Sequence, residues 1–305
     1  MTRPVLVIRL GALGDFIQST GAFAAIRAHH ADSPVTLLTT RPYAAFAAAS
    51  PWFDHVWVDE RPKWWQPGRW LALRARLRDG GFGRVYDLQT SDRSSSYFRL
   101  MGGGVEWSGI ARGCSHPHAN PGRDRLHTLD RQAEQLSMAG IPSVPSPDLS
   151  WARADIGRFG LPRPYALVCP GGAPHRPAKR WPAAHFAMLA AWLSGRGVVP
   201  VLLGTAAEEG ELAAIAARCP AARSLAGRTD LLDLAVLGRG AVAAVGNDTG
   251  PMHVLAAAGC PSVVLFSGAS DPTLCAPRGR VTVLRRPDLA GLLPDEVQAA
   301  LAAVT

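Results

Sequence analysis

The segment Asn247-Asp-Thr-Gly-Pro251, followed by His253, combines residue types that could bind an anion. An unbroken apolar run, Ala241 to Val245, precedes it, and a segment of helical composition, Met252 to Ala258, follows and stops at Gly259. A strand that leads through a tight turn into a helix directs several backbone N–H groups and the positive end of the helix dipole at one point. His253, on the first helical turn, lies close enough to donate to the same anion.

The same turn also has a purely structural interpretation. Thr249 or Gly250 can cap the helix, and Pro251 suits its first turn because a missing N–H costs nothing there. In that case Asp248 and Thr249 are only caps, and His253 is an ordinary surface residue. The local residue types leave both interpretations open.

Asp15 is a second candidate for chemistry, at the end of Gly11-Ala-Leu-Gly-Asp15 directly after the first apolar run. Glycines after a first strand let backbone and ligand approach closely, and Asp15 falls on the first turn of the next helix. It could complement the helix dipole, or it could be a general base facing a bound hydroxyl. The sequence has no dinucleotide glycine fingerprint after this strand, no phosphate-binding Walker pattern and no serine-hydrolase G-x-S-x-G pattern.

Two further segments follow predicted strands. The loop from Pro170 to Pro182 contains Arg176, Lys179 and Arg180, and cations above the carboxyl end of a strand suit a diphosphate, with a solvated basic loop as the alternative. Glu208 could accept hydrogen bonds from ribose hydroxyls, as acids do in nucleotide sites, although glutamates are also common in first helical turns.

The elements that position these residues alternate between short apolar strands and helices, which predicts right-handed βαβ units and parallel sheets. We expect strands at residues 4–10, 35–39, 55–58, 84–89, 105–110, 165–169, 198–203, 241–245, 261–266 and 281–284. We expect helices from Asp15 to about residue 30 and at residues 70–78, 93–101, 182–193, 208–218, 252–258 and 294–304.

The segment from Ile141 to Pro164 is dense in helix and strand breakers, so we place the domain boundary there. The predicted fold is α/β, with two Rossmann-like doubly wound domains, 1–150 and 151–305, that face a central cleft. The first domain is expected to bind the acceptor and the second the nucleotide-sugar, with the last helix free to pack back on the first domain.

Composition is that of a globular protein: the 305 residues are 48% hydrophobic and 18% charged. No apolar run is long enough to cross a bilayer or to form a signal peptide, and five scattered cysteines without a C-x-x-C pair favour the cytoplasm. The formal charge of +8 suggests an acidic partner, although a genome that favours arginine is the alternative. No D-x-D pair and no histidine spacing predicts a metal site, and the basic residues lack the interleaved aromatics of nucleic-acid binding.

Together these segments resemble glycosyltransferase family 9, the ADP-heptose:lipopolysaccharide heptosyltransferases, over nearly the whole chain. The residues that carry the resemblance are Val5 to Asp15, Asp87-Leu-Gln89 with Arg93-Ser94, Lys179-Arg-Trp-Pro182, Asp248-Thr-Gly250 with His253, and Phe266 to Gly279. The D-T-G-x-x-H pattern at 248–253 is the most specific of these. Gly11 departs from the family, in which Ser or Thr is frequent there, and residues 61–69 and 112–125 have no clear counterpart.

The resemblance implies a GT-B architecture and an inverting transfer of heptose or a related sugar without a cofactor or tightly bound metal. It makes Asp15 the general base. The implied donor-binding residues are Lys179, Glu208, Asp248, Thr249, Gly250 and His253. Candidate acceptor-binding residues are Arg9, Lys63 and Arg93.

The implied partners are a nucleotide-sugar, for which ADP-heptose is the expected donor, and an anionic lipopolysaccharide core or lipid A acceptor. A basic surface suits a peripheral location on the cytoplasmic face of the inner membrane, and no nucleic acid is expected to bind. The alternative is a non-catalytic nucleotide- or anion-binding protein that docks on an acidic lipid or polymer. A divergent oxidoreductase is disfavoured because the glycine fingerprint is missing.

Overall fold

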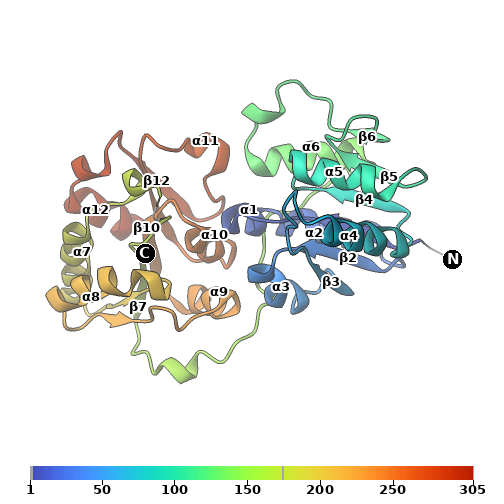
Figure 1. Cartoon of the computed structure of the whole chain (residues 1–305). Coiled ribbons are helices and arrows are strands. Elements are labelled where there is room, and N and C mark those ends of the chain that lie inside the picture. The colour runs from blue at the N-terminus through green and yellow to red at the C-terminus, as the bar shows by residue number, and fades with distance from the viewer. Residues whose placement is uncertain (1–2, 174, 305) are drawn as a thin grey trace. The chain divides into compact units, whose positions relative to one another are not determined.

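The computed structural model describes residues 3–173 and 175–304, and the chain divides into two compact units, one up to Pro147 and one from Asp148 on (Figure 1). This division falls close to the boundary expected after residue 150. Each unit is a parallel α/β domain with its own core, as the alternation of strands and helices predicts.

The first unit contains one parallel sheet. Its strands are β1 (Val5–Ile8), β2 (Val35–Thr39), β3 (His55–Val58), β4 (Arg84–Asp87), β5 (Glu106–Gly109) and β6 (His116–Pro117), in the order β3-β2-β1-β4-β5-β6. Its helices are α1 (Leu13–Gln18), α2 (Thr20–His29), α3 (Arg41–Ala48), α4 (Pro67–Asp79), α5 (Asp92–Met101) and α6 (Thr128–Met138), with a 3-10 turn, η1, at Arg123–Arg125.

The second unit repeats this arrangement. Its strands are β7 (Tyr165–Cys169), β8 (Val199–Leu202), β9 (Arg223–Ser224), β10 (Ala243–Asn247), β11 (Ser262–Phe266) and β12 (Val281–Arg285), in the order β12-β11-β10-β7-β8-β9. Its helices are α7 (Ala183–Gly195), α8 (Glu209–Arg218), α9 (Leu231–Gly240), α10 (Gly250–Ala257), α11 (Pro272–Cys275) and α12 (Pro294–Val304). Its 3-10 turns are η2 (Gly157–Phe159), η3 (Pro177–Lys179), η4 (Ala206–Glu208) and η5 (Leu289–Gly291).

Helices cover both faces of each sheet. In the second unit α7, α8 and α12 line one face, and α9 packs against α10 (Figure 1). Val297 and Leu301 of α12 are buried in this unit's core, so the last helix uses its apolar face within its own unit. In the first unit, α4 and α5 pack together on a core that contains Leu77 and Tyr97, while α6 contacts α1 and α2.

The main differences from the expected elements have physical reasons. The expected first helix is divided at Ser19 into α1 and α2, and the Ser19 hydroxyl donates there to the carbonyl of Asp15 (2.8 Å). The strand expected at 241–245 is β10, which extends to Asn247. Asn247 can be buried at the end of this strand because its side-chain amide bonds to backbone groups of the loop after β7. The apolar pattern of the sequence does not predict helix α6, because this helix buries the polar side chains of Gln132 and Gln135.

Candidate active site

In both units most of the predicted residues lie at the carboxyl edge of the sheet, near the pair formed by the unit's first and fourth strands. That point, where the strand order reverses, is where open α/β sheets bind ligands. In the first unit it lies between β1 and β4, and two contacts tie the loops there. The Arg9 guanidinium donates to the Leu88 carbonyl, and the Leu10 amide donates to Gln89 Oε1 (2.8 Å).

Asp15 lies on the first turn of α1, and its side chain is 41% exposed. Arg9 Nη2 is 3.4 Å from Asp15 Oδ1, and the Arg9 side chain is only 4% exposed. Burial lowers the pKa of Arg9, and the charge of Asp15 opposes that shift. Arg9 therefore lies beneath Asp15 as a buried counter-charge, while the carboxylate stays open to solvent and to a substrate proton.

Gly11 is required by the backbone of this loop. Its φ of +125° is rarely adopted by other residues, and a Cβ there would lie 3.0 Å from the Tyr43 ring. Tyr43 in turn stacks on Phe16, next to Asp15, with ring centroids 4.8 Å apart. The positive φ and this close packing together account for glycine at position 11.

Asp87, the last residue of β4, is fully buried. Its Oδ1 accepts hydrogen bonds from the backbone amides of Gln89 (3.1 Å) and Thr90 (3.0 Å). Burial raises the pKa of Asp87 to about 6, although these hydrogen bonds and the nearby Arg9 act in the opposite direction. Asp87 thus shapes the turn that carries Gln89, the residue tied to the β1 loop.

The other two predicted acceptor-binding residues gather near the start of α4. Lys63 is exposed, with Nζ 4.9 Å from the centre of the Trp65 ring. Arg93 of α5 donates to the Pro62 carbonyl (3.3 Å), and its guanidinium lies 5.6 Å from the Trp70 ring centre. Lys63 and Arg93 therefore belong to one neighbourhood, distinct from the buried contacts of Arg9.

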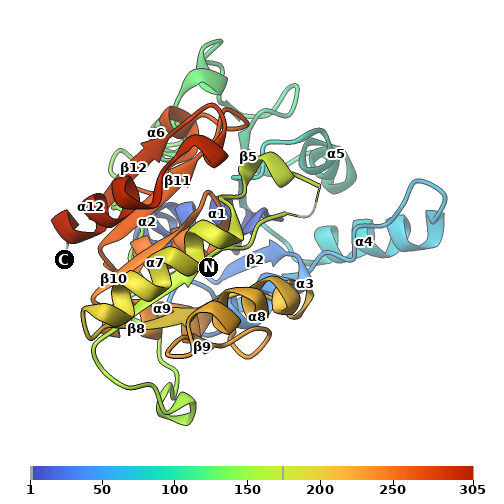
Figure 2. The same ribbon diagram turned by 90° about the vertical axis from the view of Figure 1, so that its left-hand side faces the viewer.

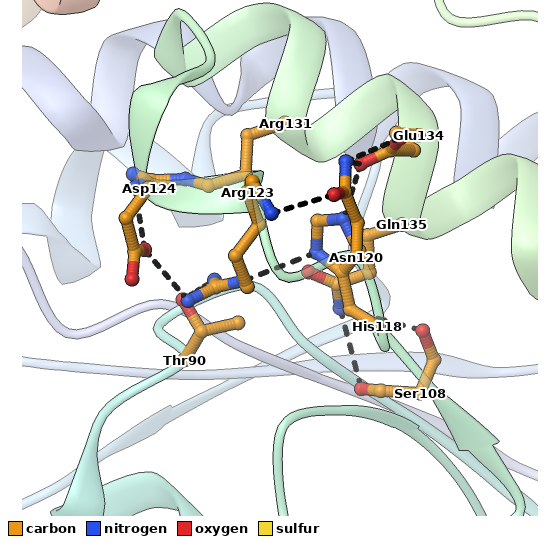
Figure 3. A network of polar contacts seen from close by, with 10 residues as sticks. Thr90, Ser108, His118, Asn120, Arg123, Asp124, Arg131, Glu134 and Gln135 are labelled. Atoms are coloured by element: carbon orange, nitrogen blue, oxygen red, sulfur yellow. Dashed lines mark hydrogen bonds and ion pairs between the residues drawn. The ribbon is translucent and has the colours of Figure 1, made fainter.

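The segment 112–125, which had no clear counterpart, contains an ordered polar network (Figure 3). His118 and Asn120 bond to Glu134 of α6 at 2.7 and 2.9 Å. Arg123 reaches Thr90 Oγ1 (3.0 Å), so the loop is tied to the turn that follows β4. This loop thereby helps to build the same carboxyl edge as Asp87.

In the second unit the turn between β10 and α10 consists of Asp248 and Thr249. Thr249 is the N-cap of α10, but its side chain makes no capping bond, because its hydroxyl donates instead to the Asn247 carbonyl (3.2 Å). Pro251 has no N–H and the Met252 amide donates to the Thr249 carbonyl (3.1 Å), so the Gly250 amide is the donor that the first turn of α10 offers to a ligand. Thr249 is the N-cap, as the structural interpretation expected, although its side chain makes no capping bond. His253 is 7% exposed and is not a surface residue.

Lys179 and Asp248 form a largely buried ion pair beside this helix N-terminus. Lys179 Nζ is 2.6 Å from Asp248 Oδ2, and the two side chains are 13% and 7% exposed. The hydroxyl of Ser270 donates to the same carboxylate oxygen (2.7 Å). Asp248 thus holds the lysine in place and offsets the cost of burying its charge.

Asn247 clamps the loop that leads to Lys179. Its Oδ1 accepts from the Trp181 amide (2.9 Å), and its Nδ2 donates to the carbonyls of Pro170 and Gly171. Asn247 is fully buried, so all of these bonds lie away from water. The loops after β7 and β10 are therefore fixed to one another, as are those after β1 and β4 in the first unit.

Glu208 supports the glycine loop after β7. One carboxylate oxygen accepts from the Gly172 amide (2.8 Å), and the other accepts from the amide (2.8 Å) and hydroxyl of Thr205. A Cβ on Gly171 would lie 1.8 Å from Glu208 Oε1, so only glycine leaves room for this contact. A role of Glu208 in nucleoside binding stays a prediction.

Sequence reasoning placed Asn247 in the anion-binding turn and Ser270 in the segment 266–279 that resembles the family, but it gave neither residue a role. It missed Tyr43, which folding brings in from another element and which nothing in its local sequence marks. Within residues 3–173 and 175–304, no three His, Cys, Asp or Glu side chains gather as a metal site would require.

Solved structures resemble the chain over its whole length and define the fold class. The heptosyltransferase described as E. coli ADP-heptose lps heptosyltransferase II has a TM-score of 0.82 and 24% identity, covering 99% of this chain and 98% of that one. A family 9 glycosyl transferase from Veillonella parvula has a TM-score of 0.84 at 20% identity, covering 99% and 97%. The predicted two-domain α/β fold of GT-B type is confirmed.

The family model of glycosyltransferase family 9 (heptosyltransferase) matches residues 70–287, and the chain belongs to this family. Lipopolysaccharide heptosyltransferase 2 of Salmonella typhimurium is 43% identical over 120 residues, which are 38% of this chain and 34% of that protein. The aligned part thus spans about a third of that relative. Lipopolysaccharide heptosyltransferase 1 of Pseudomonas aeruginosa is 26% identical over 303 residues, covering 92% of this chain and 82% of that protein.

Proposed function

We propose that this protein transfers heptose, or a related sugar, from an ADP-sugar to a lipopolysaccharide core or lipid A acceptor. The observation that carries the proposal is the uncapped N-terminus of α10 beside the Lys179–Asp248 ion pair, an arrangement suited to a diphosphate. Family membership supports the reaction class. A fold neighbour described as E. coli heptosyltransferase WaaC with ADP supports the nucleotide.

In the proposed reaction Asp15 takes the proton of the acceptor hydroxyl while that oxygen attacks the anomeric carbon. The bond from this carbon to the β-phosphate oxygen breaks, and attack from the opposite side inverts the configuration. Lys179 and the Gly250 amide at the start of α10 meet the charge that develops on the departing ADP, an interaction that strengthens toward the transition state. No tightly bound metal or other cofactor takes part in the proposed reaction.

The remaining predicted residues take supporting roles in this proposal. Glu208 contacts the nucleoside, and His253 donates to the phosphates from the first turn of α10. Lys63 and Arg93 contact the anionic acceptor, whereas Arg9 acts through Asp15 because it is buried beneath that carboxylate.

We also propose a peripheral location on the cytoplasmic face of the inner membrane. Among the described residues, no helix has both the length and the apolar character needed to span a bilayer. The formal charge of +8 favours contact with an acidic lipid surface.

The test is ADP release from ADP-heptose in the presence of lipid A carrying its inner core, with and without a chelator. Asp15→Ala should lower the rate by about 10²-fold or more while calorimetry still detects ADP binding. The rate should survive chelation. If the wild type binds ADP but releases none from any ADP-sugar, the protein is a non-catalytic nucleotide-binding protein instead.

A further inference from the structure

The segment from Arg61 to Asp79, which we call the basic arm, comprises α4 and the loop before it. Its only acidic residue is Asp79, at the very end. Its cationic residues are Arg61, Lys63, Arg69, Arg74, Arg76 and Arg78, and all of them are exposed. Figure 2 shows α4 at the edge of the first unit. The arm therefore presents concentrated positive charge to its surroundings.

The loop of the basic arm also exposes large aromatic side chains. Trp64 is 84% and Trp65 54% exposed, and their rings meet edge to face with centroids 5.4 Å apart. Indole rings are large, apolar and costly to leave in water, and they are enriched where proteins meet membrane headgroups. Two adjacent exposed tryptophans indicate a contact surface.

Helix α4 has two apolar faces. Leu77 is fully buried, and Trp70 and Leu73 pack against the same core, so these three define the inner face. The opposite side carries Leu71, which is 61% exposed.

Helical spacing places Ala75 on the same outer side as Leu71, with Ala72 beside them, and both alanines are exposed. The charged residues Arg78 and Asp79 lie on that side in the next turn and end this short apolar strip. A short apolar strip next to cations can contact the headgroup layer of a membrane.

We propose that the basic arm docks on an anionic lipid bilayer, with α4 lying along the surface and Trp64 and Trp65 entering the headgroup layer. Near such a surface each lysine or arginine contributes about 1 kcal/mol of attraction. A polyanion such as a nucleic acid would use the charge but not the apolar strip at Leu71, so the bilayer is the better match. This inference deepens the proposed membrane location and does not depend on sugar transfer.

The test is sedimentation of the full-length protein with sucrose-loaded vesicles of phosphatidylethanolamine and phosphatidylglycerol that contain no lipopolysaccharide. The wild type should bind, and binding should fall as salt is raised. The Arg69→Gln, Arg74→Gln double variant should bind about 30-fold more weakly, at about fivefold per cation. The Trp64→Ser, Trp65→Ser double variant should lose most of its binding.

The matched control replaces two exposed apolar residues of the other unit, Met188→Ser with Leu293→Ser, and should bind like the wild type. Calorimetry with ADP checks that every variant is folded. Unchanged binding of the tryptophan variant overturns the inference, as do equal binding to neutral phosphatidylcholine and binding to heparin but not to vesicles. Vesicle binding without ADP release from any ADP-sugar would refute the proposed transfer and leave the docking surface standing.

Discussion

The two units share one strand order, and each places a fully buried polar residue at the end of the fourth strand. In the first unit this residue is Asp87 of β4, and in the second it is Asn247 of β10. Asp87 accepts hydrogen bonds from two turn amides. Asn247 both accepts from an amide and donates to carbonyls, so it can join two loops where a carboxylate could not.

The groups proposed to react in the two units differ in their exposure to solvent. In the first unit an exposed acid, Asp15, rests on the buried cation Arg9. In the second, Lys179 is itself mostly buried and is paired with Asp248. A proton acceptor needs access, whereas a cation that receives a diphosphate needs position and little water. The difference in exposure thus separates the two proposed chemical tasks.

The largest effect is expected in the second unit. Lys179→Met should lower kcat/KM for the ADP-sugar by about 10²- to 10³-fold, the range for removing one group that stabilises a developing anion. Asp248→Asn should cost less, because the lysine stays while its anchor weakens. Steady-state ADP release and ADP calorimetry measure both. Equal loss in the two variants would mean that Asp248 has a role of its own and does not merely hold the lysine.

A smaller effect is expected at Arg9, which sharpens the contrast with the first unit. Arg9→Met should slow transfer by about 10-fold, the factor that corresponds to losing a charge interaction of about 1.4 kcal/mol. Without the guanidinium, the Asp15 carboxylate loses the cation that lies 3.4 Å from it, so kcat should fall while KM for the acceptor stays unchanged. Arg9→Lys should restore part of the rate.

The control for this prediction is the double variant with Asp15→Asn, which should be no slower than Asp15→Asn alone because Arg9 acts through Asp15. A raised KM for the acceptor with an unchanged kcat would instead make Arg9 a direct acceptor contact, as the sequence first indicated.

A change at Asp87 should have the smallest effect on turnover, so this prediction is tested by the free energy of unfolding. Because burial raises the pKa of Asp87 from 3.8 to about 6, the folded state holds this proton where the unfolded state has released it. Its contribution to stability is present below pH 3.8 and is lost as pH rises to about 6, a change of about 3 kcal/mol. The free energy of unfolding in urea should be measured for the wild type and for Asp87→Asn. The wild-type value minus the variant value should decline over this pH range.

Asn247, the counterpart of Asp87 in the second unit, provides the control because its side chain does not titrate. Asn247→Ala should lower stability by a similar amount at pH 4 and pH 7. A wild-type minus Asp87→Asn difference that is flat between these pH values would show that Asp87 keeps its ordinary pKa in the folded protein.

Much of the fold could be predicted because short apolar strands alternate with helices. The strands at 35–39, 55–58 and 165–169 and the helix at 294–304 have the expected bounds. Helix α6 could not be predicted in this way, because its buried face is polar. That burial depends on hydrogen bonds that Gln132 and Gln135 make with residues distant in the sequence. The break at Ser19 is also not encoded in the periodic pattern of apolar residues.

The candidate site was predictable where one local segment supplies the chemistry. The turn at 248–250 and Asp15 both fall at sheet edges as expected. The residues that contact Asp248 and Asp15 could not be predicted from the local sequence. Ser270 reaches Asp248 from 22 positions away along the chain. Arg9 was expected to face the acceptor, yet a cation that directly follows a strand can be buried or exposed, and only the fold decides.

The ion pair between Lys179 and Asp248 has a consequence for the resting protein. In the proposed reaction, the Asp248 carboxylate offsets the charge of Lys179 before the donor binds. A nucleoside diphosphate would compete with this carboxylate for the lysine, and the ion pair would form again when the nucleotide leaves. On this proposal the ion pair favours release of the product.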